Sequence, residues 1–180
     1  MWVLVPKKSS YGEGIVANNR IKINSQKAFI WGTVAIFIQM CVYYVIWMNP
    51  YVNDISLQFG SHPSVKPYEY FGGLQNWMQL RTLYLIIMLA VLIKIYLMFY
   101  SNIPGNRWQK GLWFGSALGV VKVIPGAFNT WTLVVYPNEL IQLQLINGIV
   151  GYILFGVIVS TIFNHFNVIE EASYLENKTV

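Results

Sequence analysis

Four long apolar runs constrain this chain more than any other feature of its sequence. They cover residues 28–48, 83–100, 112–136 and 140–163. An α-helix of about 20 mostly apolar residues is long enough to cross the hydrocarbon core of a bilayer. None of the four runs alternates apolar and polar residues with a period of two, which argues against transmembrane β-strands. We therefore predict an all-α integral membrane protein with four transmembrane helices.

The composition excludes two other classes of chain. Hydrophobic residues make up 56% of the sequence and charged residues 11%, and the mean hydropathy is +0.48. So few charges cannot cover the surface of a soluble domain, and so many apolar residues are incompatible with intrinsic disorder. The net charge of +5 comes from basic residues scattered beside the apolar runs, which is typical of membrane proteins. We expect the lipid bilayer, and no nucleic acid, as a partner.

The apolar runs divide the chain into three parts. Residues 1–27 form a cytoplasmic or interfacial tail, residues 28–164 a single transmembrane domain, and residues 165–180 a cytoplasmic tail. Within the domain, residues 49–80 form an external loop whose many aromatic residues indicate an ordered cap, ending in a short interfacial helix at 75–80. The link between the third and fourth runs is so short that these two spans must form a tight antiparallel hairpin.

The basic residues predict the orientation of the spans. Eight Lys and Arg residues lie on the side of the termini and two on the opposite side. The excess of Lys and Arg in short segments next to the spans marks the cytoplasmic face. Both termini are therefore expected in the cytoplasm, with the protein in the cell or inner membrane. The eight are Lys7, Lys8, Arg20, Lys22, Lys27, Arg107, Lys110 and Lys178, and the two are Lys66 and Arg81.

The third apolar run carries a stripe of small and polar residues. On an ideal helix with about 100° per residue, the members of this stripe fall within an arc of roughly 80°. Small residues allow another helix to approach closely, so we expect the stripe to face protein rather than lipid. Pro125 is expected to kink the helix. The stripe consists of Gly111, Gly115, Gly119, Lys122, Gly126 and Asn129.

Lys122 is the residue of this stripe that most needs a partner. It lies ten residues beyond the expected start of the span, or about 15 Å at 1.5 Å per residue. A lysine at the bilayer centre costs roughly 2.5–3.5 kcal/mol on insertion scales, and no Asp or Glu occurs inside the four runs. Besides Lys122, the candidate intramembrane functional or partner-pairing residues are the amides Asn129, Gln144 and Asn147.

Three interpretations of Lys122 are open. The lysine binds carbonyls and amides at the kink, or loses its charge through desolvation, and has only a structural role. Alternatively, it forms a salt bridge with a carboxylate of another subunit, because an intramembrane charge without a partner suggests one that is missing. In the third interpretation it binds a lipid headgroup, a quinone or a small anion beside the broken helix.

The sequence offers little material for catalysis. Cys41 is the single cysteine, and the two histidines, His62 and His165, lie outside the apolar runs. A thiolate metal cluster, a haem held between the spans and a nucleophile–base pair within the membrane are therefore not expected. We predict no enzyme activity, no cofactor and no metal site.

These observations lead to a hypothesis about the class of function. We expect a non-catalytic accessory or scaffold subunit of a larger membrane assembly, which binds other membrane subunits or associates with itself. One alternative is a small transporter or channel-like protein whose pathway passes Lys122 and the break at Pro125 and Gly126. Another is a membrane component that binds a quinone or a lipid between its spans.

Overall fold

The protein is built around four membrane-spanning helical segments. The computed structural model describes residues 2–3, 20–47, 49–59 and 62–172. In this part of the chain, four helical segments are long and apolar enough to cross a membrane. They are Ser25–Ile46, Leu74–Asn102, Arg107–Leu133 and Asn138–His165. The predicted class, an all-α membrane protein with four spans, is confirmed.

Two asparagines fix where helices begin. Helix α1 (Ser25–Trp47) follows Asn24, whose side-chain oxygen accepts a hydrogen bond of 3.1 Å from the backbone N–H of Lys27. Helix α4 (Arg107–Leu118) follows Asn106, which forms a capping box with Gln109. In both cases the cap satisfies backbone donors that the first helical turn leaves without a partner. These caps define the first turns of α1 and α4.

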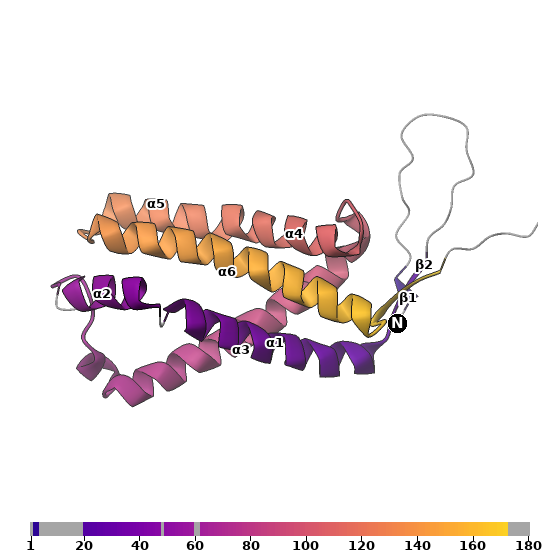
Figure 1. Ribbon diagram of the computed structural model, residues 1–180, viewed down its shortest axis with the longest axis horizontal. Coiled ribbons are helices and arrows are strands. Elements are labelled where there is room, and N and C mark those ends of the chain that lie inside the picture. Colours follow the sequence, from indigo (N-terminus) through magenta and orange to yellow (C-terminus); the bar gives the residue numbers. More distant parts are fainter. Residues whose placement is uncertain (1, 4–19, 48, 60–61, 173–180) are drawn as a thin grey trace, which may run out of the picture.

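The helices form a bundle that is tight at one end and open at the other (Figure 1). Helices α4 and α5 (Ile124–Leu133) run beside α6 (Asn138–His165), whereas α3 (Leu74–Phe99) crosses the bundle and diverges from α6 toward its own N-terminus. The diverging end carries α2 (Pro50–Phe59) and is called the α2 end here; the opposite end, which holds both described terminal segments, is called the termini end.

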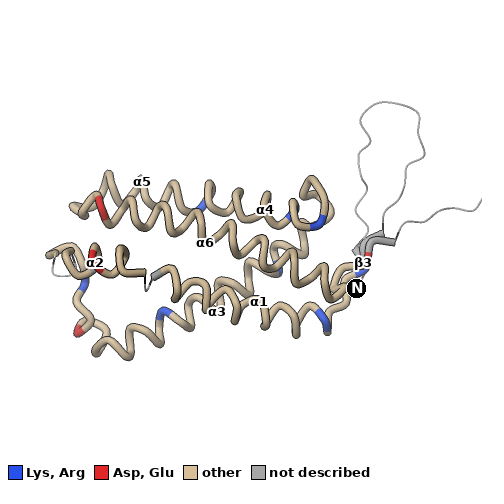
Figure 2. The backbone as a smooth tube through the Cα atoms, viewed as in Figure 1, with Lys and Arg blue, Asp and Glu red and all other residues tan. Residues whose placement is uncertain are grey.

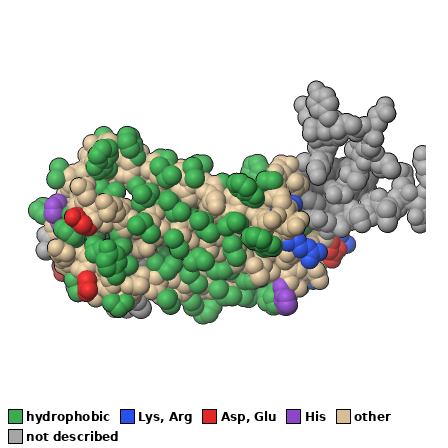
Figure 3. Space-filling view, turned by 45° about the horizontal axis from the view of Figure 1, so that its top comes forward, with side chains coloured by type: hydrophobic (Ala, Val, Ile, Leu, Met, Phe, Trp, Pro, Cys, Tyr) green, Lys and Arg blue, Asp and Glu red, His purple; other side chains and the backbone are tan. Residues whose placement is uncertain are grey.

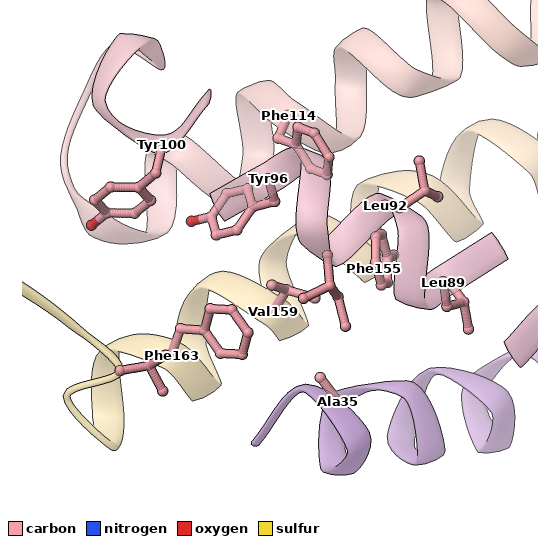
Figure 4. Packing of buried hydrophobic residues seen from close by; sticks show 11 residues of the cluster. Ala35, Leu89, Leu92, Tyr96, Tyr100, Phe114, Phe155, Val159 and Phe163 are labelled. Carbon is pink, nitrogen blue, oxygen red and sulfur yellow. The ribbon is translucent and has the colours of Figure 1, made fainter. Parts of the chain in front are cut away.

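The core lies where α3 crosses α6. Tyr96 of α3 is fully buried and packs against the rings of Phe114 and Phe163 (Figure 4). Phe155 and Val159 of α6 are also fully buried and belong to the same cluster. The core therefore holds the C-terminal halves of α3 and α6 together. The first turns of α3 contribute no residue to it.

One feature of the predicted external loop differs in the structure. The segment 75–80 is not a separate interfacial helix, because α3 begins at Leu74 and continues without a break into the apolar run. No Gly or Pro interrupts this stretch, so nothing in the sequence ends the helix there. The external loop contains helix α2 and the 3₁₀ helix η1 (Tyr68–Phe71), and a second 3₁₀ helix, η2 (Tyr100–Asn102), follows α3.

A small sheet that the sequence analysis does not predict joins the terminal segments. Strand β2 (Arg20–Ile23) pairs antiparallel with β1 (Trp2–Val3) and with β3 (Ile169–Ala172). Strands of two to four residues are too short for their alternation to stand out in a sequence. The predicted tails at 1–27 and 165–180 thus meet at the termini end, although residues 4–19 and 173–180 lie outside the described part.

Candidate functional site

The third span is not a continuous α-helix, and Lys122 lies at its irregularity. Between α4 and α5, residues Gly119–Val123 form the π-helix η3. The backbone N–H of Ile124 donates to the carbonyl of Gly119, five residues earlier, and Pro125 has no N–H with which to continue the regular pattern. π-Helical turns are often found at functional sites. The predicted disturbance near Pro125 therefore takes the form of a widened turn that contains Lys122.

Lys122 contacts two other helices through weak partners. Its Nζ lies 3.9 Å from Sδ of Met88 on α3 and 5.4 Å from the ring centre of Tyr152 on α6. A thioether is a weak acceptor and an aromatic ring offers only a cation–π attraction. No carboxylate among the described residues pairs with Lys122, and the side chain remains exposed on the surface of the bundle.

The depth of Lys122 is what makes these partners inadequate. It lies about eleven residues from the end of α5, or roughly 16 Å at 1.5 Å per residue. Figure 2 shows that most charged residues lie near the ends of the long helices, where water and headgroups can solvate them. Lys122 lies far from both ends of the third span, and in a helix that crosses a bilayer an ammonium group without an anionic partner is costly at such a position.

The glycines of the third span divide into two groups. A Cβ added at Gly111 would overlap the backbone carbonyl of Gly156, and one added at Gly115 would overlap the carbonyl of Tyr152. Helices α4 and α6 therefore approach each other as closely as their backbones allow. A Cβ added at Gly119 would lie at an ordinary van der Waals distance from Ile149.

Gly126 does not join this packing stripe. Apart from its chain neighbours and the backbone of its own helix, no described atom lies within 4 Å of a Cβ built at this position. On an ideal α-helix Gly126 would lie on the stripe. The π-helix inserts a wider turn between Gly119 and Gly126, so the residues of α5 are rotated about the helix axis away from their ideal positions. The expectation that the stripe continues past Pro125 is corrected accordingly, and Lys122 likewise lies exposed rather than in a protein-filled groove.

The structure does not gather the three predicted amides around Lys122. Asn129 on α5 is exposed, and Gln144 on α6 is exposed and donates to the hydroxyl of Tyr136 at 3.4 Å. Asn147 is half-buried, and its Nδ2 has no hydrogen-bond partner among the described residues. None of the three forms a hydrogen bond with Lys122 in this part of the chain, so they do not form a site with it.

A polar cluster between α1 and α3 is not predicted by the sequence analysis. Arg81 donates to the hydroxyl of Tyr43, and its guanidinium lies 4.9 Å from the ring centre of Trp77. One residue further along each helix, the hydroxyls of Tyr44 and Thr82 are hydrogen-bonded at 2.7 Å. The sequence analysis places Arg81 on the external side because the apolar run begins at residue 83. The absence of helix breakers after residue 73 is the signal that would have placed it inside α3.

A second missed contact links α1 to α6. Gln39 is only 5% exposed, and its Nε2 donates to the carbonyl of Gly151 at 3.1 Å. Its Oε1 has no partner among the described residues. A buried amide at this depth favours helix association through hydrogen bonds rather than through the hydrophobic effect. Gln39 therefore helps to hold α1 against the α4–α6 pair.

One face of the molecule is mostly apolar between the helix ends. Figure 3 shows hydrophobic side chains over the middle of the molecule, with acidic and basic groups at its two extremities. On α3, seven residues between Leu74 and Ile86 line an open apolar groove of about 650 Å³. Within the described residues no group of three or more His, Cys, Asp and Glu side chains is placed to hold a metal ion.

Comparisons with known proteins give no further guide to the site. No protein-family model, no curated protein and no solved structure matches this chain.

Proposed function

We propose that this protein is a non-catalytic accessory or scaffold subunit of a larger membrane assembly, and that Lys122 binds a carboxylate of another subunit. The observation that carries the proposal is the exposed position of Lys122, deep in the third span, with a thioether and an aromatic ring as its contacts. An ammonium group that reaches the surface at this depth is stabilised by an anionic partner supplied from outside the bundle.

The basic residues support an orientation with both termini in the cytoplasm. Eight Lys and Arg residues lie on the side of the termini and two toward the other side, and of these two Arg81 lies within α3. The sheet formed by β1, β2 and β3 brings both described terminal segments to one end of the bundle, as an even number of spans requires. We accordingly place the termini end in the cytoplasm and the protein in the cell or inner membrane.

A second candidate function is a small transporter or channel-like protein. The π-helix at Lys122 favours this candidate, because such turns often lie at functional sites and give a helix local flexibility. Transport requires a polar path to Lys122, whereas a subunit requires an anionic contact there. A flux that Lys122→Met abolishes while the assembly stays intact would support transport and contradict the subunit proposal.

The experiment that tests the proposal compares two lysines of the same protein. Lys122→Met and Lys94→Met each replace a span lysine with an unbranched apolar side chain, but Lys94 lies about 9 Å from the end of its apolar run at Tyr100 and can reach the interface. After gentle extraction, Lys122→Met is expected to reduce the recovered assembly about tenfold, the effect of losing ~1.4 kcal/mol of association free energy.

Lys94→Met is the matched control and is expected to leave the assembly unchanged. Thermal unfolding of both purified variants separates loss of assembly from loss of folding. Equal recovery of the assembly with both variants contradicts the proposed role of Lys122.

A further inference from the structure

We infer that the partner which binds at Lys122 is a single transmembrane helix of a different protein, and that it packs along the side of α3 formed by Tyr84, Ile87 and Val91. This inference rests on the proposed function, because it names the class of partner and the surface that receives it. These three residues are called the open face of α3 here.

The direction of the Lys122 side chain selects α3 as the helix beside the partner. Lys122 belongs to η3 in the third span, yet its Nζ lies 3.9 Å from Sδ of Met88 on α3. An anion that contacts this ammonium group therefore approaches beside Met88. On an ideal helix, the residues of the open face all lie within about 100° of Met88 and on the same side of it.

The open face is a side of α3 that the bundle leaves uncovered. Tyr84 is 56% exposed, Ile87 55% and Val91 49%. The buried core residues Leu89 and Leu92 lie on the other side of Met88. Exposed apolar side chains spaced by three and four residues form one ridge on a helix, and such a ridge packs into the groove of a second helix.

Charge and depth together select the occupant of this face. A second copy of this chain does not supply the carboxylate, because its four spans contain no Asp or Glu apart from Glu139 in the first turn of α6. A lipid headgroup stays at the interface, whereas Lys122 lies roughly 16 Å from the nearer end of the third span. A carboxylate that reaches Lys122 is therefore carried by a side chain of a spanning helix.

The first measurement tests the contact at Lys122 with a carbodiimide that enters the bilayer. A carboxylic acid adds to dicyclohexylcarbodiimide as an O-acylisourea, and an adjacent amine displaces dicyclohexylurea from it to leave an amide without a spacer. The reagent is applied to native membranes that contain the full chain, and linked peptides are identified by mass spectrometry. We expect a link between Lys122 and an Asp or Glu in a spanning segment of another protein.

The second measurement tests the open face with a photoreactive side chain. p-Benzoylphenylalanine replaces Val91 or, in the matched control, Ile86, which is 40% exposed but lies roughly 140° from Val91 around the helix. We expect position 91 to link to the same partner segment as Lys122, within about one turn of the linked acidic residue, because Val91 and Met88 differ by only about 4.5 Å along the axis. Position 86 is expected to give no link to that segment.

The outcomes separate this inference from the subunit proposal. A link from Lys122 without one from position 91, or equal links from positions 86 and 91, overturns the inference about the open face while the subunit proposal stands. A link from Lys122 to a lipid or to a second copy of this chain overturns the inference about the partner. Absence of every link, together with absence of a co-purifying protein, overturns both.

A blocking substitution provides a measurement that does not depend on cross-linking. Val91→Trp is expected to reduce recovery of the partner about tenfold, the effect of losing ~1.4 kcal/mol of association free energy, because the larger ring keeps the partner helix away from α3. Ile86→Trp is the matched control and is expected to leave recovery unchanged. Full recovery of the partner with Val91→Trp, when thermal unfolding shows that both variants are folded, contradicts packing on the open face.

Discussion

Lys94 and Lys122 show that depth and surroundings decide what an intramembrane lysine does. Both side chains are exposed on the surface of the bundle. Lys94 lies within about 9 Å of the end of its apolar run and can extend its ammonium into the interface. Lys122 lies too far from either end for this, and its contacts in the bundle are Met88 and Tyr152. The same residue type is therefore structural at one position and a binding candidate at the other.

The glycines of the third span lead to a prediction at the same scale. Gly111→Ala is expected to lower the free energy of unfolding by about 1–3 kcal/mol, because the added methyl group would overlap the carbonyl of Gly156 and force α4 and α6 apart. Thermal or denaturant unfolding in detergent micelles measures this change.

Gly126→Ala is the matched control, since no described atom of another helix lies within 4 Å of its new Cβ. It is expected to leave stability unchanged or to raise it by up to about 1 kcal/mol through the higher helix propensity of alanine. A loss of stability at Gly126 as large as that at Gly111 would show that the two glycines share one packing role, against the structure.

At the scale of the elements, the sequence predicts the spans well and their irregularities poorly. The apolar runs identify all four helices, because length and hydropathy alone define a span. They do not show that α3 begins at Leu74. Polar residues such as Gln75 and Gln79 lie outside the apolar run, but they do not interrupt the helix. The apolar runs also do not show η3. Pro125 has no N–H to donate, and the hydrogen-bond pattern that the preceding residues adopt depends on how they pack against the neighbouring helices.

The candidate site, like the helices, can be predicted only in part from the sequence. Lys122 stands out in the sequence because a charge in an apolar run is rare. The cluster around Arg81 does not stand out, because its contacts with Tyr43 and Trp77 depend on how α1 and α3 meet. Contacts between helices that are distant in the sequence depend on the crossing of the spans, which a periodic pattern does not encode.

The contact between α1 and α3 gives a prediction at this scale. The hydrogen bond between Tyr44 and Thr82 is expected to contribute about 0.6 kcal/mol, the typical value for side-chain hydrogen bonds between transmembrane helices. A double-mutant cycle with Tyr44→Phe and Thr82→Val, followed by unfolding in mixed micelles, measures the coupling. Strictly additive effects of the two substitutions would show that the hydroxyls do not interact.

At the scale of the whole molecule, the orientation is open to direct measurement. Cysteines introduced by Glu69→Cys in η1 and Asn102→Cys in η2, in a chain whose Cys41 is replaced by Ser, mark the two ends of the bundle. An impermeant maleimide applied to intact cells is expected to label the first and to reach the second only after permeabilisation. The opposite pattern would reverse the proposed orientation.

The native mass of the extracted protein tests the central claim most directly. The chain has a mass of 20.7 kDa, and native mass spectrometry after gentle extraction separates assemblies of one chain from assemblies of several. A subunit of a larger assembly is expected to give a mass that is not a multiple of 20.7 kDa, with a second protein released in fixed proportion on activation. A mass equal to one chain or to a whole number of copies would contradict the account.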